Sequence, residues 1–371
     1  MKVGILTLPF NNNYGGYLQA YALMTILKKE GHDVELIYRR HNKVSFVQKT
    51  KIVIKNTIKL LIGQKVNRII PNREKDFLQQ GRLMHSFMDK YICPKSQPLF
   101  STNELSQYVQ GRYETVIVGS DQIWRPDYVP NVEDYFLSFL HDSKVCKIAY
   151  AASFGSDMPQ YTDRERDLCG KALMNFKLVT VRERSGVDVI KRMGWIGIEP
   201  IVVLDPTMLL KKEDYDQLLP KKQSLSKGKV FCYVLDDSDN VRKIIKQASD
   251  ILQKELYYII DTKRWENVDY IMPSIEDWLC GIRDSDFVVT DSFHGMVFSI
   301  IFNKPFVVCL NKERGISRFL DLLIMLNLQE RIMDEEKIMD IIGQPIEWEF
   351  VNTEIMKLQR KSITILRNSL Q

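Results

Sequence analysis

The clearest candidate for acid–base chemistry is His294, in the stretch Thr290-Asp291-Ser292-Phe293-His294-Gly295. This stretch lies between an apolar, β-branched run at 287–290 and an apolar helical pattern at 296–302. In open α/β sheets, ligands bind beyond the carboxyl ends of the strands, and a helix N-terminus there favours anions. We therefore expect His294 to act as an acid or base, with Asp291 or Ser292 capping the helix. The alternative is that both residues are only caps and that the histidine is packed or lies on the surface.

A pair of arginines follows another strand-like run, in Val181-Arg182-Glu183-Arg184-Ser185. Two guanidinium groups beside a cleft can bind a carboxylate or a phosphate through paired N–H groups. The competing interpretation is an exposed helix start in which Glu183 is an acidic residue of the first turn. The spacing alone leaves both open.

Two polar loops that follow strand-like runs could bind a saccharide. The first, residues 11–16 (NNNYGG), has amides for sugar hydroxyls and two glycines that let backbone N–H groups approach a ligand. The second, residues 119–126 (GSDQIWRP), places polar groups beside a tryptophan. The alternatives are a plain β-turn-α connection for the first loop and a structural, buried Trp124 for the second.

Several familiar motifs are missing from the sequence. It has no GxGxxG fingerprint, P-loop, HExxH or GxSxG motif, and its five histidines show no HxxxH spacing. The sequence therefore predicts neither a dinucleotide site nor a metal site.

The basic residues are concentrated in one segment. The chain has 371 residues, with 52 Lys and Arg against 47 Asp and Glu, a formal net charge of +5. Residues 36–72 contain nine Lys and Arg and no acid, and Arg73 extends the run to ten, so the remaining chain is net negative. A protein that follows nucleic acid usually spreads its bases over a broad face, so a nucleic-acid partner is disfavoured.

Apolar periodicity predicts two α/β domains. Strand-like runs at 2–8, 34–38, 115–119, 147–152 and 178–182 alternate with helical patterns, and a second series follows at 201–204, 229–235, 257–260, 287–290 and 305–310. This order is typical of doubly wound folds. We expect a Rossmann-like domain at 1–200 with a basic helical insertion at 40–90, a second at 201–350, and an amphipathic helix at 351–371. A short helix at 275–279 should stop at Gly281, and a ligand cleft should separate the two domains.

The ends of the chain and the cysteines bear on location. Met1 leads directly into a strand-like run, which leaves no room for a signal peptide, and no uncharged apolar stretch reaches the roughly 18–20 residues that span a bilayer. The six cysteines are widely separated and show no CxxC, as in reduced cytosolic proteins. We expect a cytoplasmic protein.

Seven stretches together resemble the polysaccharide pyruvyl transferase family. In order from residue 1 to about residue 325 they are KVGILTLPFNNNYGGYLQAYAL, YETVIVGSDQIW, IAYAASFGS, VTVRERSG, VLDPTMLL, DFVVTDSFHGMVFSIIFNKPFVV and RGISRFLDLL. The resemblance implies two Rossmann-like domains facing a central cleft, as in GT-B glycosyltransferases, with a C-terminal helix crossing back to the first domain. It also implies transfer of pyruvyl from phosphoenolpyruvate to two hydroxyls of a sugar, forming a cyclic ketal and releasing phosphate.

The resemblance also assigns roles to residues. His294 matches the family's motif histidine, and Arg182 matches an arginine of the donor site. We expect catalysis by His294, Asp291 and Asp121, donor binding by Arg182, Ser292, Phe293, Gly295, Arg314 and Arg318, and acceptor binding by Asn12, Asn13, Tyr14, Gly15, Ser120, Gln122 and Trp124. Some members carry Arg-Leu-His where this chain has Ser-Phe-His. The donor anion must then rely on Arg182, on backbone N–H groups or on the two later arginines.

The implied partners are phosphoenolpyruvate as co-substrate and a saccharide acceptor on the first-domain side, with no metal or other cofactor. Lys51, Lys55 and Lys59 share one helical sector of the basic segment, with Lys65 close by. The segment is either a solvated insertion or, if the acceptor is lipid-linked, a contact with anionic lipid at the inner face of the membrane. Two other functions stay open: a glycosyltransferase that uses a nucleotide-sugar donor, and a non-catalytic saccharide-binding protein.

Overall fold

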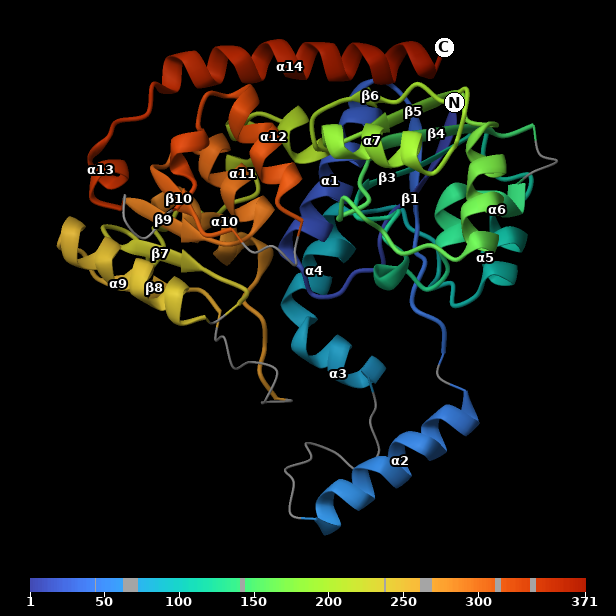
Figure 1. Ribbon diagram of the computed structural model, residues 1–371, viewed down its shortest axis with the longest axis horizontal. Coiled ribbons are helices and arrows are strands. Elements are labelled where there is room, and N and C mark those ends of the chain that lie inside the picture. The colour runs from blue at the N-terminus through green and yellow to red at the C-terminus, as the bar shows by residue number, and fades with distance from the viewer. Residues whose placement is uncertain are drawn as a thin grey trace.

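The computed structural model describes residues 1–43, 45–62, 73–140, 144–236, 238–260, 269–310, 315–333 and 338–371. Two α/β units lie side by side, and the C-terminal helix runs along both of them (Figure 1). The expected α/β class and the crossing C-terminal helix are therefore confirmed. In the described part of the chain, no helix is both long enough and apolar enough to cross a membrane.

The first unit is built on a parallel sheet of six strands. They are β1 (Lys2–Leu6), β2 (Asp33–Ile37), β3 (Thr115–Asp121), β4 (Cys146–Ala152), β5 (Leu178–Val181) and β6 (Ile201–Val202), in the order β2-β1-β3-β4-β5-β6. Strand β3 is buried along its whole length, as its continuous apolar run predicts. The run at 201–204, predicted to open the second domain, instead completes the first sheet, because Thr180 pairs with Ile201.

The second unit holds a parallel sheet of four strands. They are β7 (Val230–Tyr233), β8 (Leu256–Tyr258), β9 (Phe287–Thr290) and β10 (Phe306–Val308), in the order β10-β9-β7-β8. Both sheets are parallel, so the loops after their strands gather at one edge of each sheet.

Helices cover and connect the two sheets. They are α1 (Tyr14–Lys29), α2 (Phe46–Leu61), α3 (Arg73–Gln80), α4 (Arg82–Tyr91), α5 (Thr102–Val109), α6 (Asp163–Leu173), α7 (Arg184–Arg192), α8 (Lys212–Asp216), α9 (Asp239–Leu252), α10 (Ile275–Asp284), α11 (Phe293–Ile301), α12 (Ser317–Met325), α13 (Ile338–Gly343) and α14 (Trp348–Ser369). A short 3₁₀ helix, η4, spans Pro206–Leu209. The predicted basic insertion comprises α2, α3 and α4.

Gly281 does not end α10 as predicted. The helix continues to Asp284, and a Cβ atom at Gly281 would lie 2.3 Å from Cε2 of Phe231. The glycine is there because the helix packs closely on strand β7, so it marks a close contact rather than a stop.

The two units share one apolar core at their junction. The ring of Tyr14, at the start of α1, stacks on Trp278 of α10 with centroids 5.1 Å apart, and its hydroxyl donates to the Pro273 carbonyl at 3.0 Å. The C-terminal end of helix α14 is fixed to the first unit, because Arg367 forms an ion pair with Glu30 at 2.6 Å at the end of α1. The contacts of Tyr14 with Trp278 and Pro273 join the first unit to the second.

The base of the α2–α4 insertion carries a buried histidine, His85, between the rings of Phe77 and Tyr17, with centroids 4.6 and 6.3 Å away. Burial, with a smaller effect of the Arg40 charge, lowers the pKa of His85 from 6.5 to about 4. Between these two pH values the unfolded chain binds a proton that the folded chain does not.

We expect stability to fall as the pH drops from 6.5 to 4, with roughly 2–3 kcal/mol of this loss due to His85. His85→Phe keeps an aromatic ring and removes the titration, so its unfolding free energy should change less over this window. Urea unfolding at several pH values measures the difference, and parallel curves for the two proteins would contradict the assignment.

Candidate active site

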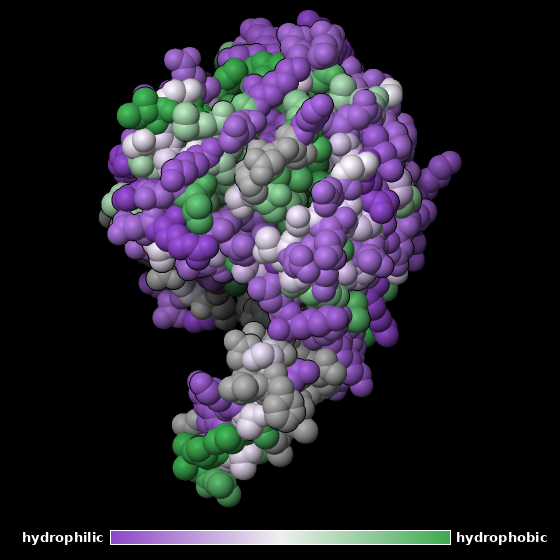
Figure 2. Space-filling model, turned by 90° about the vertical axis from the view of Figure 1, so that its right-hand side faces the viewer, coloured by the Kyte–Doolittle hydropathy of each residue, from purple (hydrophilic) through white to green (hydrophobic). Residues whose placement is uncertain are grey.

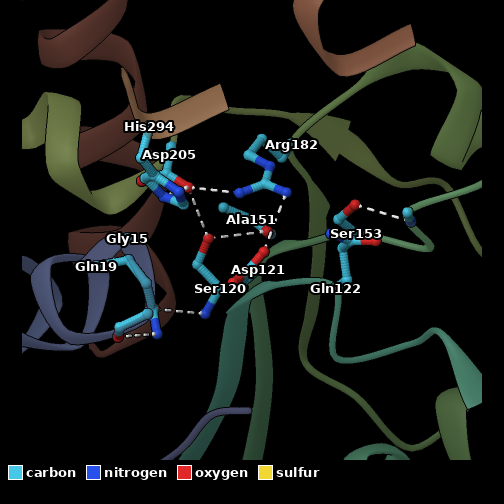
Figure 3. A network of polar contacts seen from close by, with 12 residues as sticks. Gly15, Gln19, Ser120, Asp121, Gln122, Ala151, Ser153, Arg182, Asp205 and His294 are labelled. Atoms are coloured by element: carbon cyan, nitrogen blue, oxygen red, sulfur yellow. Dashed lines mark hydrogen bonds and ion pairs between the residues drawn. The ribbon is translucent and has the colours of Figure 1, made fainter. Parts of the chain in front are cut away.

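Side chains from three strand ends and one helix start meet at the junction of the two units. Ser120 is the next-to-last residue of β3, Arg182 follows β5, Asp205 follows β6, and His294 lies in the first turn of α11 (Figure 3). All four are buried, with 5% of His294 exposed. The carboxyl ends of the strands therefore form the site, as the topology predicts.

Asp205 is the centre of this cluster. Its Oδ2 accepts hydrogen bonds from Arg182 Nη1 at 2.8 Å and Ser120 Oγ at 3.1 Å, and lies 3.8 Å from His294 Nε2 (Figure 3). Its Oδ1 accepts from the Thr207 N–H at 3.0 Å and the Thr207 hydroxyl at 2.7 Å, which caps η4. Burial alone would raise the pKa of Asp205, but His294, Arg182 and Thr207 hold it well below its usual range. The group is an anion at neutral pH.

His294 is positioned by its helix and by the opposite unit. Ser292 caps α11, its Oγ accepting from the Gly295 N–H at 3.3 Å, so the cap falls to one of the two predicted residues. The imidazole lies against the start of α1, where a Cβ atom at Gly15 would be 1.9 Å from Nδ1. Only glycine fits there. At 3.8 Å from Asp205, the buried Nε2 has no hydrogen-bond partner among the described residues, which leaves it available to a substrate.

Two guanidinium groups lie against the ring of Phe293. Arg182 is 4.6 Å from the ring centroid and Arg318 is 5.5 Å from it. The second cation is therefore Arg318 of α12, whereas Arg184, the other arginine of the predicted pair, is exposed. Burial and the charge of Arg182 lower the pKa of Arg318 to about 10, which means that its cation is destabilised where it stands.

Arg182 is balanced by three carboxylates. Besides Asp205, its Nη2 lies 3.5 Å from Asp121 Oδ1 and its Nε lies 3.5 Å from Glu183 Oε2. Burial would lower the pKa of Arg182, but these acids raise it above its ordinary value. The buried Glu183 also accepts a hydrogen bond from Ser153 Oγ at 2.5 Å, and burial raises its pKa. Glu183 is thus part of the cluster, not an exposed first-turn acid.

A small cavity opens beside this cluster, between the two units. Its lining includes Gly155, Glu183 and Ser185 from the first unit, and Gly315, Ser317 and Arg318 from the second. Both units contribute polar groups, so a ligand held here would contact both.

Asp291, predicted to be a catalytic base, binds backbone N–H groups instead. Its two oxygens accept the backbone N–H groups of Leu235 and Asp236 at 2.8 and 2.9 Å, which fixes the loop after β7. The carboxylate adjacent to His294 is that of Asp205. Sequence reasoning missed Asp205 as a site residue, although it follows β6 in the quoted VLDPTMLL stretch.

Several predicted acceptor residues are buried. The Trp124 ring is fully buried, stacks on Phe136 at 4.9 Å, and donates its Nε1–H to the Tyr135 carbonyl at 3.1 Å. It is a core residue, so the expected aromatic platform is corrected. Tyr14 is likewise fully buried at the junction, as is Ser120 under Asp205.

The remaining predicted residues fall into three groups. Asn13 is exposed and caps α1 by accepting from the Gly15 N–H at 3.2 Å. Asn12 and Gln122 are buried, Asn12 donating to the Phe77 carbonyl at 3.2 Å and Gln122 accepting from Arg125 at 3.1 Å. Arg314 lies outside the described residues. Among those residues, no group of three or more His, Cys, Asp and Glu side chains is placed to hold a metal ion.

Comparisons with known proteins agree on family and fold. Residues 13–313 match the family described as polysaccharide pyruvyl transferase. No curated protein matches the sequence. Two solved structures with a similar fold are S. aureus MnaA with UDP (TM-score 0.55, 11% identity, covering 95% of this chain and 90% of that chain) and UDP-GlcNAc 2-epimerase from Neisseria meningitidis bound to UDP-GlcNAc (0.52, 11%, 100% and 99%). At this identity they show the fold alone, which is GT-B-like as expected.

Proposed function

The chain belongs to the polysaccharide pyruvyl transferase family, and from this we propose that it moves pyruvyl from phosphoenolpyruvate to two hydroxyls of a sugar, forming a cyclic ketal and releasing phosphate. The observation that carries the proposal is the buried cluster of His294, Asp205 and Arg182 at the junction of the units. It combines a proton-transfer group with cations for an anionic donor.

His294 serves as the general acid in this scheme. It protonates C3 of the enol phosphate, which becomes a methyl group, and positive charge develops at C2. A sugar hydroxyl adds to C2 and returns a proton to His294, and the C2–O bond then breaks with its electron pair leaving on the phosphate. The second hydroxyl closes the ketal at C2 and loses its proton in turn. Asp121, whose carboxylate lies 3.5 Å from Arg182, is the proposed base for this closure. The Asp205 carboxylate, 3.8 Å from the imidazole Nε2, stabilises the protonated imidazole by its charge.

Arg182 and Arg318 bind the donor. The buried Nη2 of Arg182 and Nε of Arg318 have no hydrogen-bond partner among the described residues, and both groups lie on the Phe293 ring. Two neighbouring cations repel each other, and after burial this repulsion is the next cause that lowers the pKa of Arg318. A phosphate or carboxylate between them would relieve the repulsion and stabilise the charge that develops on the departing phosphate.

The acceptor is proposed to be a sugar of a surface polysaccharide or its precursor, entering from the side of Asn13, which is exposed at the start of α1. The scheme uses phosphoenolpyruvate as co-substrate and needs neither a metal nor another cofactor.

Phosphoenolpyruvate should raise the melting temperature of the protein in buffer with EDTA, and UDP-sugars and GDP-sugars should not. Arg318→Gln should weaken phosphoenolpyruvate binding by about 10- to 100-fold, because a hydrogen bond to a charged group contributes about 1.5–3 kcal/mol. Titrations followed by thermal shift measure both effects. Arg360→Gln, an exposed arginine on α14, is the matched control and should bind normally.

The same titrations separate the competing functions. A shift with a nucleotide sugar and none with phosphoenolpyruvate would favour a glycosyltransferase on the same fold. Binding of saccharides with no phosphate release in any donor and acceptor combination would favour a non-catalytic relative. Mass spectrometry of acceptors that carry an added pyruvyl ketal would identify the sugar.

A further inference from the structure

Helix α2 stands apart from both units. It extends below the body of the molecule, beneath α3 (Figure 1). None of its side chains from residue 49 to residue 61 is buried. A helix that buries no side chain over residues 49–61 is marginally stable in water, because most helices depend on packing of an apolar face. The helix therefore requires something to pack against.

One face of α2 is apolar and exposed. Ile54, Ile58 and Leu61 follow at intervals of four and three residues, which places them on one side of the helix, and they are 54%, 53% and 80% exposed. Ile62, directly after the helix, is 64% exposed. Figure 2 shows apolar side chains gathered at the far end of this projection. We call Ile54, Ile58 and Leu61 the apolar stripe.

A basic flank borders the apolar stripe. At about 100° per residue, Lys51, Lys55 and Lys59 lie about 60° to 140° around the helix from Ile54, along one side of the stripe, and Ile62 at about 80° falls among them. They belong to the run of ten bases without an acid between residues 36 and 73, in a chain that is otherwise net negative. This is the pattern of helices that lie in a membrane interface, with the apolar face among the acyl chains and lysines at the headgroups.

We propose that α2 docks on an anionic lipid surface through the apolar stripe, with Lys51, Lys55 and Lys59 on the headgroups. The charge of α2 favours an anionic lipid surface over a second copy of the chain. Pairing two copies of α2 through the stripe would bring two acid-free, basic segments together, and these would repel each other. A lipid surface with negative headgroups satisfies both the apolar and the basic faces.

Helix α3, at the base of this projection, is hydrogen-bonded to segments near the active site. Asn12 Nδ2 donates to the Phe77 carbonyl of α3 at 3.2 Å, and the Met272 N–H donates to the Gln80 carbonyl at 2.8 Å. Asn12 lies in the loop that leads into α1, whose Gly15 contacts His294. Docking of α2 would turn this edge of the molecule toward the membrane. Delivery of a lipid-linked acceptor to the site from that side rests on the proposed function, whereas lipid binding does not.

Vesicle flotation of the full chain tests the docking. Vesicles of 70:30 phosphatidylcholine and phosphatidylglycerol should carry the protein to the top of the gradient, and pure phosphatidylcholine should not. Ile54→Asp combined with Leu61→Asp should reduce the bound fraction at least fivefold, as should Lys51, Lys55 and Lys59 all changed to Gln. The matched controls are Ile196→Asp with Leu225→Asp, and Lys221, Lys222 and Lys227 changed to Gln, all at exposed sites elsewhere.

Each result of these experiments supports or contradicts lipid docking by α2. No flotation of the wild-type chain, or equal losses in the control variants, would overturn the proposal. A dimer in light scattering that dissociates in the Ile54 and Leu61 variant would assign the stripe to a second copy instead. Phosphate release with a soluble sugar should be unchanged in that variant, so a failed membrane contact and a failed proposed function give different results.

Discussion

His294→Gln is expected to reduce phosphate release from phosphoenolpyruvate by at least about 10³-fold, below detection in most assays, because the general acid that protonates C3 is lost. Glutamine is polar and close to histidine in length, but it cannot transfer a proton at neutral pH. The imidazole Nε2 has no hydrogen-bond partner among the described residues, so its replacement breaks no hydrogen bond at this atom, and Asp205 keeps its hydrogen bonds from Arg182, Ser120 and Thr207. The variant should therefore fold normally.

Three measurements make this prediction decisive. Phosphate release is assayed with an acceptor that the wild-type protein uses, and the melting temperature should stay within a few degrees of wild type. Phosphoenolpyruvate should still stabilise the variant, because Arg182 and Arg318 are intact. His32→Gln, in the turn before β2, is a matched histidine replacement that should keep full activity. Near-normal turnover in His294→Gln would reject the assignment of the acid.

The fold was predictable because each buried parallel strand is a short, continuous apolar run followed by a polar loop. Phe287–Thr290 was located to the residue, since Asp286 and Asp291 bound a run of four apolar or β-branched residues. Ile201–Val202 was located but assigned to the wrong sheet. Periodicity detects a strand and says nothing of its neighbours, and β6 is placed by its pairing with β5.

The site was only partly predictable, for the same reason. His294 and Arg182 stand at strand ends within their own short motifs, which a local pattern can detect. Asp205 gains its role from Ser120, Arg182 and His294, which are 85, 23 and 89 positions away, and no local pattern encodes such a meeting. Trp124 was predicted to contact the acceptor but is buried in the core. The sequence of a polar loop around a tryptophan does not show whether the ring faces solvent or the core.

Asp205→Asn is expected to damage both stability and turnover. An asparagine amide offers one acceptor oxygen where the carboxylate offers two, and it carries no charge, so Arg182 would lose its hydrogen-bonded counterion in a buried site. Removal of one partner of a buried ion pair costs about 3–5 kcal/mol. By comparison, Asp214→Asn, which breaks the exposed pair with Lys29, should cost at most about 1 kcal/mol.

The pH dependence of this loss tests whether charge is its cause. Since the folded state holds the pKa of Asp205 well below its usual range, the carboxylate contributes stability that is complete above the unfolded value of about 3.9 and is lost as the pH falls toward the folded value. The difference in unfolding free energy between wild type and Asp205→Asn should therefore be largest near pH 7 and shrink below about pH 4. If the difference were the same at all pH values, lost packing rather than lost charge would be its cause. In the soluble assay we expect turnover to fall by about 10²-fold at pH 7, because the imidazole loses the neighbouring anion that stabilises its protonated form. Full activity in a stably folded Asp205→Asn protein would confine this residue to holding Arg182 and η4 in place.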